Sequence, residues 1–144
     1  MKALIFICNR YEAFNIRKSH RREAVFKSSF KQRKEKLKNC IGVFISIEKE
    51  DNSNGKKLLL KDICKLLQEC KLKTVLIAPF AHLSCHLARP EKAIKFICDI
   101  EEDLKKNGYN VKRSSFGYHK NLLLSVSGCN NNIRWRSYSC GTNL

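Results

Sequence analysis

The chain has 144 residues, of which 43% are hydrophobic, and a formal net charge of +16 at pH 7. That hydrophobic fraction supplies a core for one domain and excludes a disordered chain. No apolar run approaches the roughly 20 residues of a membrane helix, so we expect no membrane partner. Eight cysteines at scattered positions, without a CxxC pair, predict free thiols in a reducing compartment rather than a disulfide framework.

The first predicted element is a buried strand over residues 2–8, with the sequence KALIFIC. A basic stretch follows, and between Arg10 and Lys38 eleven Lys and Arg stand against three Glu. We expect residues 10–39 to form a basic excursion, either a helix or a hairpin. Such an excess of positive charge favours nucleic acid as a partner, and a solubilising surface charge is the alternative interpretation.

A second strand is predicted over 41–49 (IGVFISIEK), because the segment alternates and is β-branched. The cluster EDNSNG at 50–55 predicts a turn, and a helix is predicted over 57–71. Apolar residues of this helix recur with a period of 3.6 residues, which predicts one buried face. They are Leu59, Ile63, Leu66 and Cys70.

The third strand, 73–80 (KTVLIAPF), is expected to end at Pro79, which cannot donate to a ladder. Pro90 is typical of the first residue of a helix, and Gly108 is typical of the position just beyond the end of one. The inner face of this second helix is predicted to comprise Ala93, Ile97, Ile100 and Leu104.

The last two strands are predicted over 109–113 and 121–127, and residues 130–144 are expected to form an irregular tail that frays. The order is therefore β–(basic)–β–α–β–α–β–β, without a repeat or a linker. This order predicts a single domain over 1–144 of the α+β (α/β) class, with a β-sheet core and two main helices.

The motif HLSCH contains three side chains that suit either metal binding or nucleophilic catalysis. On a helix His82, Cys85 and His86 would share one face and could approach a zinc ion. Structural zinc needs four ligands and no second cluster supplies the fourth, so we predict no metal. His82 could alternatively activate Cys85, although no third group orients the pair. A packed structural histidine is the plainer interpretation.

The motif FGYHK at 116–120 offers a hydroxyl, an imidazole and an ammonium in succession after a glycine that lets the chain bend. A lysine and an aromatic residue at the mouth of a strand suit contacts with a phosphate or a ribose. An ordinary loop that enters a strand, with Lys120 exposed, is the alternative.

Three segments in this order, FISIEKED (44–51), PFAHLS (79–84) and FGYHK, resemble the N-terminal editing domain of archaeal threonyl-tRNA synthetases. The similarity spans roughly residues 40–128. The resemblance implies the fold of D-aminoacyl-tRNA deacylases, usually a homodimer, and cytoplasmic hydrolysis of mischarged Ser-tRNA(Thr) without a cofactor. Serine and threonine differ by one methyl group, worth roughly 1–3 kcal/mol in a pocket, so a synthetase benefits from a second sieve.

The resemblance also implies which residues form the site. Lys120 matches the family lysine that helps to order the catalytic water and the carbonyl, and His82 matches the pocket histidine. Tyr118 matches an aromatic residue of the substrate pocket, and His119 stands where the family usually has another aromatic residue, often tyrosine. The 2′-hydroxyl of the substrate would help to activate the water. Backbone groups that line the pocket would be those around Ile47, Pro79, Ala81 and Phe116.

The chain departs from the family pattern at two places. Cys8, Asn9 and Arg10 stand where the family usually has His-Ser-Asp, and Ile133 aligns with an expected acidic residue. A catalytically degenerate RNA-binding module of the same fold is therefore the alternative to an active deacylase.

No class II synthetase core fits in 144 residues, so we expect either a free-standing protein that acts in trans or a domain excised from its synthetase. A threonyl-tRNA synthetase is then a further expected partner. The basic excursion fits action in trans on tRNA(Thr), because Lys and Arg contacts to phosphates give affinity without sequence preference.

Overall fold

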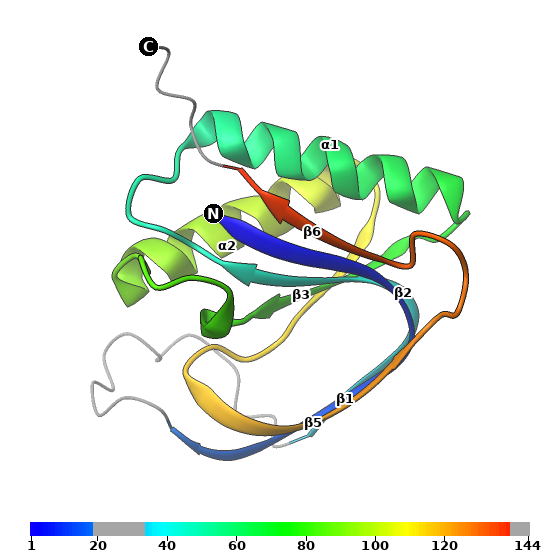
Figure 1. Cartoon of the computed structure of the whole chain (residues 1–144), viewed down its shortest axis with the longest axis horizontal. Coiled ribbons are helices and arrows are strands. Elements are labelled where there is room, and N and C mark those ends of the chain that lie inside the picture. Colours follow the sequence, from blue (N-terminus) through cyan, green and yellow to red (C-terminus); the bar gives the residue numbers. More distant parts are fainter. Residues whose placement is uncertain (19–33, 139–144) are drawn as a thin grey trace.

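The computed structural model describes residues 1–18 and 34–138, which form a six-stranded mixed sheet with two long helices on one face (Figure 1). The strands are β1 (Lys2–Lys18), β2 (Lys34–Ser46), β3 (Thr74–Pro79), β4 (Asn110–Arg113), β5 (Tyr118–Val126) and β6 (Ile133–Ser137). The helices are α1 (Ser53–Glu69), α2 (Pro90–Lys106) and the 3-10 turn η2 (Ala81–Leu83). The predicted α+β class with two main helices is confirmed.

The strand order is β4-β3-β2-β1-β5, and β6 also pairs with β1. β2, β3 and β4 are parallel because α1 and α2 are their crossover connections. β1 runs antiparallel to β2, β5 and β6. The carboxyl ends of the three parallel strands therefore meet at one edge of the sheet.

The main core lies between the sheet and the two helices. Its helical residues confirm both predicted inner faces: Leu59, Ile63 and Leu66 from α1, with Cys70 partly buried beside them, and Ala93, Ile97, Ile100 and Leu104 from α2. Pro90 is the first residue of α2, and Gly108 follows its C-terminal cap with a φ of 84°. A left-handed backbone at that position favours glycine, as the prediction required.

α1 begins at Ser53 rather than at residue 57, so the predicted turn over 50–55 is wrong in its second half. The reason is the side chain of Asn52, whose oxygen accepts hydrogen bonds from the backbone N–H groups of Asn54 at 3.0 Å and Gly55 at 3.3 Å. An asparagine that satisfies unpaired N–H groups in this way starts a helix within a polar cluster that otherwise resembles a turn.

In its described parts, residues 10–18 and 34–39, the basic excursion consists of two antiparallel strands and not of a helix. β1 extends to Lys18 and β2 begins at Lys34, with Phe14 and Lys34 as the last aligned pair. Residues 19–33 lie outside the described part of the chain. We call the arm the three-stranded region formed by residues 10–16, 34–38 and 119–125.

On the face opposite the helices, a second core connects the sheet to the arm. The rings of Phe6 and Phe80 both pack against Phe44, with ring centroids 4.9 Å apart in each pair. In β2, Asn39 has a φ of 50°, and β1 shifts its register against β5 after Cys8. Because of these irregularities, odd-numbered residues of β1 and β2 in the arm face this core, together with an even-numbered residue of β5: Tyr11, Ala13, Leu37 and Leu124.

The prediction of an irregular tail is wrong for residues 133–137, which form β6 and pair with the first half of β1. The ladder continues from β5 to β6 through Ile7, which accepts from the Ser127 N–H at 2.9 Å and donates to the Asn132 carbonyl at 3.0 Å. Tyr138 is buried, and its hydroxyl donates to Asp62 at 2.6 Å. Residues 139–144 lie outside the described part.

No helix within residues 1–18 and 34–138 is both long enough and apolar enough to cross a membrane. The seven cysteines of these ranges all carry free thiols. Cys8 and Cys40 face each other across β1 and β2 and are both buried.

Candidate functional site

The carboxyl ends of β2, β3 and β4 form the edge at which sheets with parallel strands usually bind ligands. The backbone residues expected to line a pocket lie at or just beyond these ends: Ile47, Pro79, Ala81 and Phe116. Backbone hydrogen bonds join the ends of neighbouring strands. The Phe80 N–H, just beyond β3, donates to the Ile45 carbonyl of β2, and the Ser114 N–H, just beyond β4, donates to the Ile77 carbonyl of β3, both at 2.8 Å. The fold therefore places these four predicted residues along one edge of the sheet.

Lys120 reaches this edge from β5. Its ammonium donates to the hydroxyl of Ser114 and to the carbonyl of Ser115, both at 2.5 Å. The carboxylate of Glu35 lies 3.9 Å away, and the Lys120 side chain is only 14% exposed. The alternative of an exposed loop lysine is therefore wrong. Burial lowers the pKa of Lys120, and the nearby charge of Glu35 partly opposes that shift.

Glu35 is the centre of a polar cluster that the sequence analysis missed. Its carboxylate accepts hydrogen bonds from the Ser115 N–H at 2.8 Å, the Ser115 hydroxyl at 2.7 Å and the Ser114 hydroxyl at 2.5 Å. The hydroxyl of Tyr11 lies 2.8 Å from that of Ser114, and burial raises the pKa of this tyrosine. We call Tyr11, Glu35, Ser114, Ser115 and Lys120 the lysine cluster.

His82 and the lysine cluster share no hydrogen bond within the described residues. His82 is exposed on η2, and its ring meets Phe80 edge-on with centroids 5.3 Å apart. His119 is also exposed, and it points away from Lys120 because neighbouring residues of a strand face opposite sides. Tyr118, half-buried, begins β5. The roles assigned to these three residues remain predictions.

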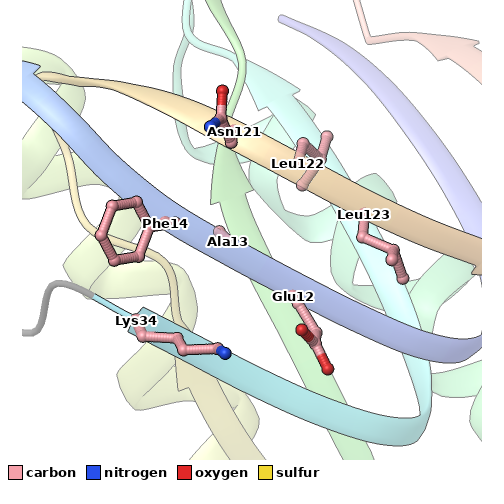
Figure 2. Close-up of a pocket in the computed structure, with 7 residues that line it drawn as sticks. All are labelled: Glu12, Ala13, Phe14, Lys34, Asn121, Leu122 and Leu123. Atoms are coloured by element: carbon pink, nitrogen blue, oxygen red, sulfur yellow. The ribbon is translucent and has the colours of Figure 1, made fainter.

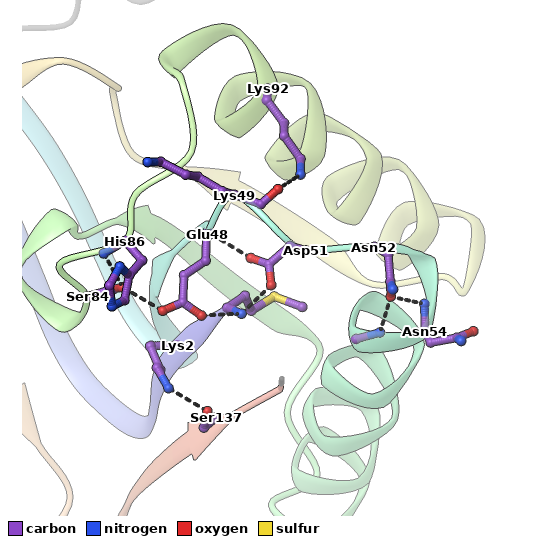
Figure 3. A network of polar contacts seen from close by, with 12 residues as sticks. Lys2, Glu48, Lys49, Asp51, Asn52, Asn54, Ser84, His86, Lys92 and Ser137 are labelled. Carbon is purple, nitrogen blue, oxygen red and sulfur yellow. Dashed lines mark hydrogen bonds and ion pairs between the residues drawn. The ribbon is translucent and has the colours of Figure 1, made fainter. Parts of the chain in front are cut away.

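The loop after His82 is fixed by a second polar network (Figure 3). Ser84 donates to Glu48 at 2.5 Å, and Glu48 pairs with the amino group of Met1 at 2.8 Å. Asp51 pairs with the same amino group and accepts from the Glu48 N–H at 2.6 Å. The network holds the segment behind His82 against the turn that precedes α1.

The helical geometry that zinc binding by HLSCH requires is absent. η2 ends at Leu83 and Ser84 is extended, with a φ of −146°, so His82, Cys85 and His86 do not share a helical face. Among the described residues no group of three His, Cys, Asp or Glu is placed to hold a metal. The same break in the helix separates His82 from Cys85 and removes the basis for a nucleophilic pair.

Replacing Glu35 with glutamine is expected to lower the pKa of Lys120 further below its ordinary 10.5, because the Glu35 charge now opposes the effect of burial. NMR titration of the Lys120 ε-methylene group measures the change. Glu12→Gln is the matched control, since Glu12 pairs with Arg10 on the other face of the arm.

The sign of the pH dependence follows from the lowered pKa. Between that pKa and 10.5 the unfolded chain binds more protons at Lys120 than the folded chain does. This lysine therefore makes the free energy of unfolding increase with pH across that interval, and Glu35→Gln widens the interval. An unchanged or raised Lys120 pKa in the variant would contradict the pairing of these two side chains.

Residues 1–132 match the family model described as the Archaea-specific editing domain of threonyl-tRNA synthetase. The threonine–tRNA ligase of Thermococcus gammatolerans is 41% identical over 103 residues, which are 69% of this chain and 16% of that protein. The ligase of Methanocaldococcus jannaschii is 39% identical over 98 residues, 66% of this chain and again 16% of the relative. The chain thus spans about one sixth of the length of these relatives.

Among solved structures, the chain is similar to a c-Myc DNA unwinding element binding protein, with a TM-score of 0.66 and 17% identity. The likeness covers 95% of this chain and 98% of that one. At this identity it shows the fold alone, and the predicted α+β fold of the D-aminoacyl-tRNA deacylase type is confirmed.

Proposed function

We propose that this chain, which belongs to the Archaea-specific editing domain family of threonyl-tRNA synthetase, hydrolyses the ester of mischarged Ser-tRNA(Thr). The observation that carries the proposal is the buried ammonium of Lys120, held at the edge where β2, β3 and β4 end. A fixed positive charge in a poorly solvated site is suited to a reaction that develops negative charge on a carbonyl oxygen.

In the proposed mechanism a water, ordered by the 2′-hydroxyl of the terminal adenosine, attacks the aminoacyl carbonyl. The bond between that carbonyl and the ribose 3′-oxygen then breaks, and the 3′-oxygen leaves as a hydroxyl with the proton that the water loses. An ammonium has three donor protons, of which Ser114 and Ser115 accept two. The third is directed to the carbonyl oxygen or to the water, since Glu35 at 3.9 Å is beyond hydrogen-bond range. Burial lowers the pKa of Lys120, and the Glu35 charge favours the protonated form by opposing that shift.

The substrate would be held mainly by main-chain groups around Ile47, Pro79, Ala81 and Phe116. The Ile47 carbonyl already accepts from the Ala88 N–H at 2.8 Å, so the segment before α2 is tied to the segment just beyond β2. We assign His82, on η2, as the pocket histidine, and Tyr118 and His119, which precede Lys120 at the start of β5, as further substrate contacts. Main-chain recognition needs no particular side chain and is compatible with the departures at Cys8–Arg10 and Ile133.

Those departures favour a second candidate, a catalytically degenerate tRNA-binding module of the same fold. Cys8 is buried against Cys40, and Arg10 is engaged by Glu12 at 2.6 Å. Ile133 is an exposed apolar side chain on β6. Neither place carries the side chains that the family pattern has there.

Single-turnover deacylation of Ser-tRNA(Thr) and Thr-tRNA(Thr) by the purified chain separates the two candidates. We expect serine to be released at least about 10-fold faster than threonine, the lower end of what one methyl group allows. If both rates equal the buffer control and tRNA(Thr) binding is sensitive to salt, the deacylase is ruled out and the tRNA-binding module is supported.

The proposal extends to a homodimer, to a threonyl-tRNA synthetase as protein partner and to action in the cytoplasm. The dimer is supported by Ile133 and Trp135, which are 51% and 55% exposed on the sheet face that carries no helix. A solution mass of 16.7 kDa, the mass of one chain, in the same preparation would contradict the dimer.

A further inference from the structure

The arm has two faces of different chemistry, because its residues alternate between them. In β2, Glu35 and Leu37 turn toward the second core and the lysine cluster. Lys34, Lys36 and Lys38 alternate with them and are all exposed. We call the face that carries these three lysines the outer face.

The neighbouring strand adds one more cation and a single acid to the outer face. Lys38 stands opposite Arg10, Lys36 opposite Glu12 and Lys34 opposite Phe14. Glu12 accepts from Arg10 at 2.6 Å and lies 3.9 Å from Lys36. The Arg10 hydrogen bond lowers the pKa of Glu12, and the charges of Lys36 and Lys34 lower it further. All three cations therefore lie close enough to the Glu12 carboxylate to stabilise its charge. One carboxylate among four cations leaves a surface that is strongly positive.

The spacing of the lysines suits a nucleic-acid backbone. Alternate residues of a strand lie about 6.6–6.8 Å apart, close to the separation of successive phosphates along an RNA strand. Three ammonium groups in line, each a compact point charge on a flexible stem, can each meet one phosphate. Scattered solubilising lysines would not be expected in such a line.

Phe14 adds an aromatic surface next to the row. Its ring is 45% exposed, beside Lys34 and Asn121. A pocket of about 260 Å³ opens there, and Figure 2 shows its residues coming from β1, β2 and β5. The lining comprises Glu12, Ala13, Phe14, Lys34, Asn121, Leu122 and Leu123. An exposed ring beside positive charges is the arrangement that stacks an unpaired base.

We propose that the outer face binds the sugar–phosphate backbone of tRNA, with Lys34, Lys36 and Lys38 on successive phosphates and Phe14 stacked on an unpaired base. Arg10, opposite Lys38, adds positive charge beside the row. RNA is favoured over an anionic membrane because the cations are in line and flank an aromatic ring. That the RNA is a tRNA rests on the proposed function. In this proposal the outer face binds the tRNA, and the lysine cluster on the opposite face of the arm takes part in the hydrolysis.

The test compares two triple variants that remove the same charge. Lys34→Gln, Lys36→Gln and Lys38→Gln together change the outer face, and Lys57→Gln, Lys61→Gln and Lys65→Gln change the exposed side of α1. Filter binding of uncharged tRNA(Thr) is measured over a range of salt concentrations. We expect the arm variant to reduce the slope of log K against log salt by about 2–3, at roughly 0.7–0.9 per phosphate contact, and the α1 variant to leave it unchanged. Phe14→Ala should weaken binding by at least about 5-fold with the same slope.

Equal losses in both triple variants, or a loss in neither, would overturn the proposal. So would an arm variant that keeps tRNA binding but no longer binds phosphatidylserine vesicles, since the outer face would then contact membranes. Photo-crosslinking of thiouridine-labelled tRNA to the unaltered chain maps the contact even if a variant fails to fold, and crosslinks confined to peptides outside the arm would also overturn it. Uncharged tRNA has no aminoacyl ester, so this binding assay does not depend on hydrolysis and can fail separately from the proposed deacylase activity.

Discussion

Replacing Lys120 with alanine is expected to lower the single-turnover rate of Ser-tRNA(Thr) hydrolysis by about 100- to 1000-fold, the usual cost of removing one preorganised donor to a developing oxyanion. The size of the effect follows from the surroundings of the ammonium. Two of its protons are fixed by Ser114 and Ser115, and the side chain is largely shielded from water. Its remaining donor therefore acts without reorganisation and with little screening.

The same substitution leaves the Glu35 carboxylate without its cation, so loss of folding has to be separated from loss of chemistry. The double variant Lys120→Ala with Glu35→Gln removes both charges of the 3.9 Å pair. If it melts like the parent chain and remains slow, the loss is chemical. Lys112→Ala, which removes an exposed lysine of β4, is the control and should react at the parental rate. A parental rate in Lys120→Ala would remove this residue from the mechanism.

Replacing Gly42 with alanine is expected to destabilise the fold by about 3 kcal/mol, at the upper end of the cost of overpacking a core. Gly42 lies opposite Phe6, and an added Cβ would overlap Cε2 and Cζ of that ring and stand 2.8 Å from Cδ2. The ring cannot move aside easily, because Phe6 is fully buried and packs edge-on against Phe44. Urea denaturation measures the loss.

Gly128→Ala is the control for Gly42→Ala, because a Cβ there meets nothing within 4 Å. We expect its free energy of unfolding to stay within about 0.5 kcal/mol of the parent chain. Adding Phe6→Ala to Gly42→Ala should cost less than the sum of the two single changes, because it removes the ring that the new methyl group meets. Equal stabilities of the two glycine variants would show that the sheet yields at Gly42 without strain.

Local patterns were sufficient to predict the elements whose signals lie within one segment. The inner face of α2 follows from apolar residues spaced at 3.6, and its ends follow from Pro90 and Gly108. β6 was missed although IRWRS alternates between apolar and polar residues, because the strand has only five residues and its pairing partner is β1, at the other end of the chain. Strands of this kind are specified by tertiary pairing more than by their own composition.

The site was predictable only in part for a related reason. A motif indicated Lys120, but Glu35 lies in a run of lysines and acquires its role from residues about eighty positions away, Ser114 and Ser115. Only the register of β1 with β2 and β5 brings them together. Alternation along β2, with Glu35 between Lys34 and Lys36, was the one signal in the sequence that could have suggested an inward acid.

The alternation of β2 between Lys34 and Lys38 has a consequence for how this stretch can diverge. Each face can accept substitutions without disturbing the other, so the RNA affinity and the hydrolysis that we propose could change separately. A change in length by one residue is different, because it would send Glu35 to the solvent and a lysine into the polar interior. Homologous chains should therefore differ here by exchange of side chains or by paired insertions, and seldom by the gain or loss of a single residue.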